Sequence, residues 1–124
     1  IYEDKYLIIE AKNEVKTSRE EIFKSEIEQL SNSMNWFEKE YPDKSGVPVL
    51  IHPSTVLHRE AFSPKGAVVL NEYNLKAFVN NTRDFFIKLS ERESSSWDIN
   101  EITSQLKNYK LERKDIKNYF INIK

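Results

Sequence analysis

The sequence contains no cysteine and little glycine or proline. Its 124 residues include no Cys, two Gly and four Pro. The absence of cysteine excludes disulfides and thiolate-based zinc or redox sites, and it favours a cytoplasmic protein. Because Gly46 and Gly66 are far apart and are the only glycines, a Gly-rich phosphate loop is excluded, and with it P-loop and Rossmann sites.

Long apolar runs are also missing. No run approaches the roughly 18 apolar residues that a membrane-spanning helix needs, so we expect no membrane association. Apolar residues nevertheless make up 39% of the chain. This is enough for one hydrophobic core in a chain of domain size.

The two signs of charge are separated along the chain. The formal net charge is −1, but residues 1–50 hold 7 basic and 11 acidic side chains, whereas the last twenty residues hold 6 basic and 2 acidic ones. A basic tail is compatible with phosphate binding and equally with a solvated helix face. The candidates for contacts with nucleic acid are Lys114 and Lys117.

Periodicity predicts alternating strands and helices. Short runs rich in β-formers predict strands at 6–11, 47–51 and 66–70. The Ser18–Glu21 spacing of a capping box predicts that a long helix begins there and continues to about Tyr41. Its apolar stripe consists of Phe23, Ile27, Leu30, Met34, Phe37 and Tyr41. We expect an irregular crossing at 53–65.

The second half of the chain is predicted to be mainly helical. A helix is expected after Asn71, with Leu75, Phe78, Val79, Thr82, Phe85, Phe86 and Leu89 facing inward. A polar break at 91–98 precedes a helix from Ile99 to Tyr109. The sequence does not decide whether the last element is a helix or a strand. The order of elements indicates a mixed α/β fold, with a core at 1–90 and a basic, mostly helical tail at 91–124.

Residues with the potential for chemistry are concentrated at Glu10-Ala11-Lys12. Because side chains alternate along a strand, Glu10 and Lys12 project from one face. A carboxylate suits a hard cation such as Mg²⁺, and such a cation activates water and stabilises charge on a phosphodiester. An ordinary surface ion pair has the same residues, so both interpretations stay open at this point.

The context of this triplet resembles the core of the PD-(D/E)xK nuclease superfamily, the restriction-endonuclease-like fold. The apolar strand Leu7-Ile8-Ile9 leads into Glu10-Ala11-Lys12, and a helix, two strands and a second helix follow. The resemblance covers roughly residues 5–90. It implies a mixed sheet flanked by helices and metal-dependent hydrolysis of DNA, as in restriction or repair enzymes.

The resemblance also implies roles for individual residues. Glu10 would be a metal ligand, Lys12 the catalytic lysine and the Ala11 carbonyl a further metal contact, with Mg²⁺ or Mn²⁺ as cofactor. Members of the family often place a polar residue of the following helix near the site. Glu26, Gln29 and Ser33 share such a flank, and Gln29 is the predicted auxiliary residue.

One part of the family pattern is missing from the sequence. A second acidic ligand, normally an Asp on the preceding strand, has only Glu3 and Asp4 as candidates. Six residues of strand span about 20 Å, so Asp4 is too far from Glu10 unless the chain bends sharply. We therefore expect the preceding strand to lie before Ile1, or a second subunit to complete the fold.

Two alternatives to a nuclease remain from the sequence. The first is an inactive relative of the same fold that binds nucleic acid or another protein. The second is an unrelated α/β interaction domain in which Glu10 and Lys12 form a surface ion pair. His52 and His58 are expected to be ordinary loop residues, since no third His or Cys is present to complete a zinc site, although His52 lies at a strand end.

Overall fold

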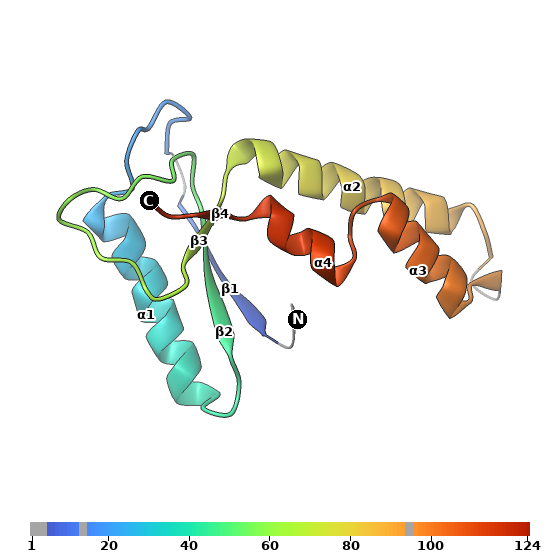
Figure 1. The fold of residues 1–124 in the computed structure, drawn as a ribbon, viewed down its shortest axis with the longest axis horizontal. Helices are drawn as coiled ribbons and strands as arrows, with labels where there is room; N and C mark the ends of the chain where they lie inside the picture. The colour runs from blue at the N-terminus through green and yellow to red at the C-terminus, as the bar shows by residue number, and fades with distance from the viewer. Residues whose placement is uncertain (1–4, 13–14, 94–95) are drawn as a thin grey trace. The chain divides into compact units, whose positions relative to one another are not determined.

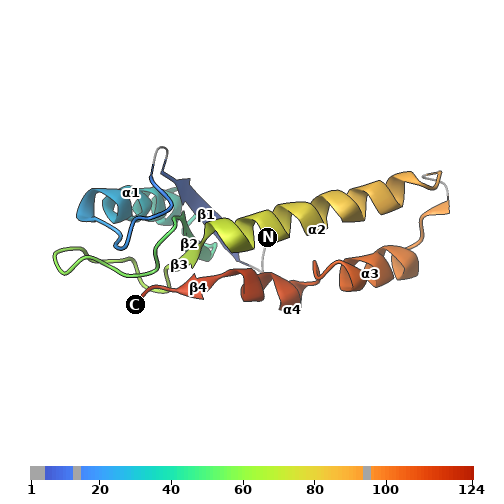
Figure 2. The same ribbon diagram turned by 90° about the horizontal axis from the view of Figure 1, so that it is seen from above.

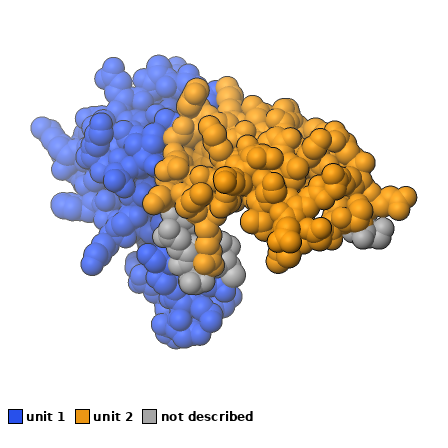
Figure 3. All heavy atoms as spheres, turned by 45° about the vertical axis from the view of Figure 1, so that its right-hand side comes forward, with its two compact units in different colours: residues 1–72, 120–124 blue, residues 73–119 orange. Residues whose placement is uncertain are grey.

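The computed structural model describes residues 5–12, 15–93 and 96–124. The chain forms two compact units, one made of residues 1–72 and 120–124 and the other of residues 73–119 (Figure 3). The expected division at residue 90 differs from this one, because the second long helix lies almost entirely in the second unit. Unit 1 is discontinuous in sequence, since its last five residues follow unit 2.

The described residues of unit 1 form a four-stranded mixed sheet. The strands are β1 (Tyr6–Ala11), β2 (Gly46–Ile51), β3 (Val68–Leu70) and β4 (Ile121–Asn122), in that order across the sheet (Figure 1). β1, β2 and β3 are parallel, and β4 is antiparallel to β3. The predicted α/β class is therefore confirmed.

Helix α1 (Lys24–Glu40) connects β1 to β2 and covers one face of these strands. The ring of Tyr6 lies 5.7 Å from that of Phe37 on α1. Because side chains alternate along a strand, Glu10 and Lys12 face the same side as Tyr6. The buried residues of the helix include Ile27, Leu30, Met34 and Phe37, as its stripe predicted. The side chains of Glu10 and Lys12 are thus directed toward α1.

The predicted start of this helix is wrong. The helix begins at Lys24, not at Ser18, and the residue before it is Phe23. Ile22 forms a parallel bridge with Leu57, and its backbone N–H donates to the Val56 carbonyl at 2.7 Å. This long-range pairing holds the segment extended, so the helix starts only after it. Phe23 and Tyr41 consequently lie outside the helix and are 43% and 46% exposed.

The core of unit 1 lies between α1, the sheet and the crossing that connects β2 to β3. It is formed by Ile22, Ile27, Leu30, Leu50, Ala61, Ala67 and Val69, with Leu57 and Ile123 packed against it. The crossing is irregular, as predicted. It is tied to the end of the chain by two backbone hydrogen bonds, from Lys124 to the Thr55 carbonyl and from Leu57 to the Lys124 carbonyl. The C-terminal residues therefore contribute to unit 1.

Unit 2 is helical. It contains α2 (Glu72–Ser90), α3 (Ile99–Asn108), α4 (Arg113–Ile116) and a 3-10 turn (Lys117–Tyr119). Only the first residue of α2, Glu72, belongs to unit 1. Figure 2 shows α3 and α4 running alongside α2. Tyr119 is buried: its ring packs edge-on at 5.1 Å from that of Phe78, and its hydroxyl donates to the Lys110 carbonyl at 3.0 Å. The ring contact thus connects Tyr119 to α2, and the hydrogen bond connects it to the segment that follows α3.

The inward face predicted for α2 is only partly correct. Phe85 and Leu89 are buried, but Val79 and Phe86 are 53% and 60% exposed. The predicted stripe was wider than the face covered by the two short helices and the turn. Within the described ranges, no helix has the length and apolar character required to cross a membrane.

Candidate active site

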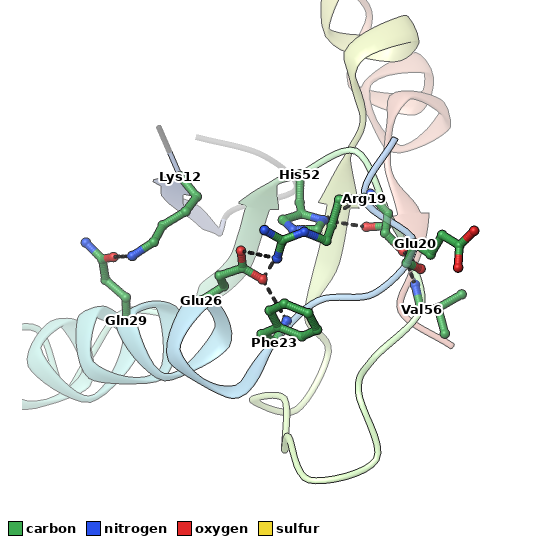
Figure 4. A network of polar contacts seen from close by, with 9 residues as sticks. Lys12, Arg19, Glu20, Phe23, Glu26, Gln29, His52 and Val56 are labelled. Carbon is green, nitrogen blue, oxygen red and sulfur yellow. Dashed lines mark hydrogen bonds and ion pairs between the residues drawn. The ribbon is translucent and has the colours of Figure 1, made fainter. Parts of the chain in front are cut away.

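Three polar residues on one flank of α1 contact the carboxyl ends of β1 and β2. They are Glu26, Gln29 and Ser33, separated by three and four positions, so they lie on one side of the helix. Ser33 contacts Glu10, Gln29 contacts Lys12, and Glu26 contacts His52. Figure 4 shows the last two contacts side by side on the helix. This series of contacts is the candidate functional site.

Glu10 is held by a serine of the helix. The side chain of Glu10 is half-buried, one residue before the end of β1, and its strand position pairs with Leu50. The Ser33 hydroxyl donates a hydrogen bond to Glu10 Oε1. Glu10 has a second carboxylate oxygen, Oε2, so its capacity to accept hydrogen bonds or bind a cation is not exhausted. Ser33 therefore orients this carboxylate.

Lys12 and Gln29 form the second contact. The ammonium Nζ of Lys12 donates to Oε1 of Gln29 at 3.2 Å, and both residues are exposed. The structure therefore brings Gln29, the predicted auxiliary residue, against Lys12, while Ser33 contacts Glu10. Ala11, the third predicted residue, is exposed and pairs with Ile51 at the end of the strand.

The residues around Glu10 fit only part of a magnesium site. Mg²⁺ is usually bound through one or two carboxylates together with water and substrate phosphate. Glu10 supplies one carboxylate, and the Ala11 carbonyl is the other predicted donor. Among the described residues, no group of three or more His, Asp or Glu side chains is arranged to hold a metal ion. Asp4, the other acidic candidate from the sequence, lies outside the described residues.

The third contact is a buried network around Glu26. Glu26 and His52 are 5% and 2% exposed. Glu26 Oε1 accepts from Nη1 of Arg19 at 3.1 Å, and Oε2 accepts from the Phe23 backbone N–H at 2.6 Å. His52 Nε2 lies 3.4 Å from the same Oε2. The carboxylate thus connects the segment before α1, the first turn of α1 and the end of β2.

The hydrogen bonds of His52 define its tautomer. The Ser54 backbone N–H donates to His52 Nδ1 at 3.0 Å, which is nearer than the Ser54 carbonyl oxygen at 3.2 Å, so Nδ1 acts as an acceptor. A neutral imidazole then carries its proton on Nε2, which faces Glu26. We assign this tautomer from the heavy-atom geometry. His52 is therefore a buried partner of Glu26 and not the ordinary loop residue that the sequence suggested.

A signal for His52 was present in the sequence. It continues the alternation of Pro48 and Leu50 beyond β2, and Glu26 shares its helix flank with Gln29 and Ser33. His58 differs from His52: it is half-buried, and its ring packs edge-on at 5.7 Å from that of Phe23.

The two lysines predicted to contact nucleic acid belong to unit 2. Lys114 lies on α4 and Lys117 begins the 3-10 turn, and both are exposed. Lys114 Nζ is 3.8 Å from Glu112 Oε1, a loose surface ion pair. The two side chains are accessible to a ligand, while Glu10, Lys12 and Gln29 belong to unit 1.

Comparison with known proteins places the chain in no family. No protein-family model matches the sequence, no curated protein matches it, and no solved structure matches its fold. The arrangement of its residues is the basis for any functional assignment.

Proposed function

We propose that the chain is a metal-dependent, restriction-endonuclease-like domain that hydrolyses DNA phosphodiester bonds in a restriction or repair system. The observation that carries the proposal is the pair of contacts from α1 to the two charged residues of the triplet. Ser33 holds Glu10, and Gln29 holds Lys12. A carboxylate and an ammonium are thereby oriented at one strand end.

The proposed roles follow from the chemistry of these groups. Glu10 and the Ala11 carbonyl would hold Mg²⁺ or Mn²⁺, which when bound supplies an activated water and stabilises charge on the phosphate. Lys12 pairs with a phosphate oxygen or orients the attacking water. Gln29 holds the flexible lysine side chain, and Ser33 holds the carboxylate.

The order of the elements supports the proposed fold. A strand with the Glu-x-Lys triplet leads to a covering helix and then to a parallel neighbour, β2. β1 is first in the sheet order, so within the described part of the chain its outer edge has no neighbouring strand. A further strand at that edge, from adjoining sequence or a second subunit, would bring the second acidic ligand that the proposal requires.

The test is DNA cleavage by the full-length gene product. Supercoiled plasmid is incubated with Mg²⁺ or Mn²⁺, and we expect nicking that falls about 100-fold or more in Glu10→Ala and in Lys12→Ala. We expect a smaller loss, about tenfold, in Gln29→Ala, because this residue acts through Lys12. Cleavage at the wild-type rate in all three variants would reject the proposal.

A matched control is available on the same helix. Lys24 and Glu28 form an exposed ion pair, with Nζ 3.6 Å from Oε1, away from the triplet. Lys24→Ala and Glu28→Ala remove the same kinds of charge and are expected to cleave like the wild type. A copurifying nuclease would give equal activity in every preparation.

A second candidate is an inactive module of the same fold that binds nucleic acid. It is favoured by the single carboxylate found at the strand end among the described residues. In this case the wild type binds DNA without cleaving it. We propose in either case that Lys114 and Lys117 contact backbone phosphates, so replacing both with Gln flattens the salt dependence of binding by about 1 to 2 in log–log slope.

A further inference from the structure

The segment before α1 forms an open pocket in unit 1. The pocket has a volume of about 320 Å³ and is lined by Lys16, Ser18, Arg19, Glu20, Glu21 and Phe23. Two cations and a hydroxyl are therefore gathered on a stretch of chain that no element of the proposed nuclease site includes. The pocket adjoins that site through Arg19, because the partner of Arg19 is Glu26.

Arg19 contacts both an aromatic ring and a buried carboxylate. Its guanidinium carbon lies 4.4 Å from the centroid of the Phe23 ring, and its Nη1 donates to Glu26 Oε1. The Glu26 side chain is only 6% exposed, whereas the Arg19 side chain is 31% exposed. A guanidinium has five N–H donors in a planar fork, so one edge can bond the buried carboxylate while the other reaches solvent.

Glu26 keeps other donors when Arg19 moves. Its Oε2 accepts from the Phe23 backbone N–H at 2.6 Å and faces Nε2 of His52 at 3.4 Å. Among the residues that the structure describes, none forms a hydrogen bond with His52 Nε2, which carries the proton in the assigned tautomer. Because His52 and Phe23 remain in place, the buried carboxylate is not left without donors if Arg19 turns to an anion.

Arg19 and Lys12 contact consecutive turns of the same helix flank. Lys12 bonds Gln29 and Arg19 bonds Glu26, three residues earlier (Figure 4). Side chains three apart on a helix are neighbours, with Cβ atoms about 5–6 Å apart. A nucleic acid whose phosphate meets Lys12 therefore has a second basic group beside it along α1.

We propose that Arg19, together with Lys16 and Ser18, binds a backbone phosphate of the nucleic acid next to the Glu10–Lys12 site, and that Arg19 leaves Glu26 to do so while His52 stays on that carboxylate. The nucleic-acid ligand rests on the proposed function. The chemistry suits phosphate, because guanidinium groups bind it through two parallel hydrogen bonds. Glu20 and Glu21 at the pocket weaken the attraction, which provides a second test.

The experiment measures DNA binding without metal. Binding of the full chain to a fluorescent oligonucleotide is followed by anisotropy in EDTA at several salt concentrations. We expect Arg19→Gln to weaken binding several-fold at low salt and to reduce the log–log salt slope by about 0.7 to 0.9, the loss of one phosphate contact. The matched control is Arg59→Gln, which removes an exposed arginine of the β2–β3 crossing, and it should leave the slope unchanged.

Two further variants keep the proposal open to refutation if Arg19→Gln does not fold. Lys16→Gln removes an exposed cation of the pocket and should also lower the slope, whereas the double variant Glu20→Gln, Glu21→Gln should tighten binding. An Arg19→Gln protein that is folded and has the wild-type affinity and slope overturns the proposal. Inorganic phosphate binding as tightly as the oligonucleotide would show a free-phosphate site and also overturn it.

The outcome separates this inference from the proposed function. Glu10→Ala removes cleavage under the proposed function but should keep the salt slope, since Glu10 donates nothing to phosphate. No cleavage by the wild type together with an Arg19-dependent slope rejects the nuclease and supports the phosphate pocket. Cleavage that depends on Glu10, with a slope independent of Arg19, rejects the pocket alone.

Discussion

The contacts of Lys12 and of Glu26 with their partners lie on the same flank of α1 but differ in burial. The Lys12–Gln29 hydrogen bond joins two exposed residues at 3.2 Å. The Glu26 and His52 side chains are 6% and 0% exposed, with the facing atoms 3.4 Å apart. The helix therefore presents an open polar contact and a closed one on consecutive turns.

The difference follows from the cost of an unpaired polar group. Away from water, a carboxylate without donors is strongly destabilising. Glu26 accepts hydrogen bonds from Arg19 and Phe23 and faces His52 Nε2. Because Lys12 and Gln29 are exposed, water can replace either partner of their hydrogen bond at little cost in free energy. We infer that the buried contact serves the fold and that the exposed contact is available to a ligand.

The largest expected effect is that of Glu26→Ala on stability. This change leaves the Phe23 N–H and the facing His52 Nε2 without their carboxylate partner inside the protein. We expect the free energy of unfolding to fall by about 2–4 kcal/mol, measured by urea denaturation.

The control is Glu28→Ala on the same helix. Glu28 is exposed, and its ion pair with Lys24 is worth at most about 0.5 kcal/mol. Equal losses in Glu26→Ala and Glu28→Ala would remove the distinction between the closed and the open contact.

A smaller effect on stability is expected for Lys12→Ala. The hydrogen bond to Gln29 is exposed, so the free energy of unfolding should change by less than about 0.5 kcal/mol, although DNA cleavage is expected to be lost. The same urea denaturation experiment measures it. A loss of about 2 kcal/mol would assign Lys12 to the fold and weaken its catalytic role.

The smallest effect concerns an ion pair with no buried member, at the turn after α1. The hydrogen bond from Lys44, at 3.1 Å, is the main cause that lowers the pKa of Asp43, with smaller effects of its own backbone and of the Lys44 charge. Because the pKa is lower in the folded state, any stabilisation is present above the unfolded pKa and is lost as the pH falls through the folded pKa. Lys44→Gln should raise the pKa of Asp43 toward its ordinary value in an NMR titration. A pKa unchanged in Lys44→Gln would show that Lys44 is not the cause.

The local elements could be predicted because their signals are local. The alternation at 6–11 and the three-four spacing from Ile27 to Phe37 each lie within one element. The structure contains both the strand and the helix that these patterns predict. The flank of Glu26, Gln29 and Ser33 was also correct as geometry, since helical periodicity alone places these three residues together. Their contacts with the strand ends follow once α1 packs on β1 and β2.

Non-local pairing explains most of what the sequence did not predict. The start of α1 is displaced by the bridge of Ile22 with Leu57, thirty-five positions away along the chain. The alternation of Pro48, Leu50 and His52 indicates a shared face, but the burial of His52 also depends on α1 covering the end of β2. The exposure of Phe86 likewise depends on how much of α2 its short partners cover.

The discontinuity of unit 1 has a consequence for synthesis on the ribosome. β4 and its bonds to Thr55 and Leu57 come after unit 2 in the chain, so β3 emerges before its antiparallel neighbour. Pairing β3 with β4 requires closure of a long loop, whose entropic cost rises only slowly with length. The helices of unit 2 can therefore form during translation, and the sheet of unit 1 is completed after them.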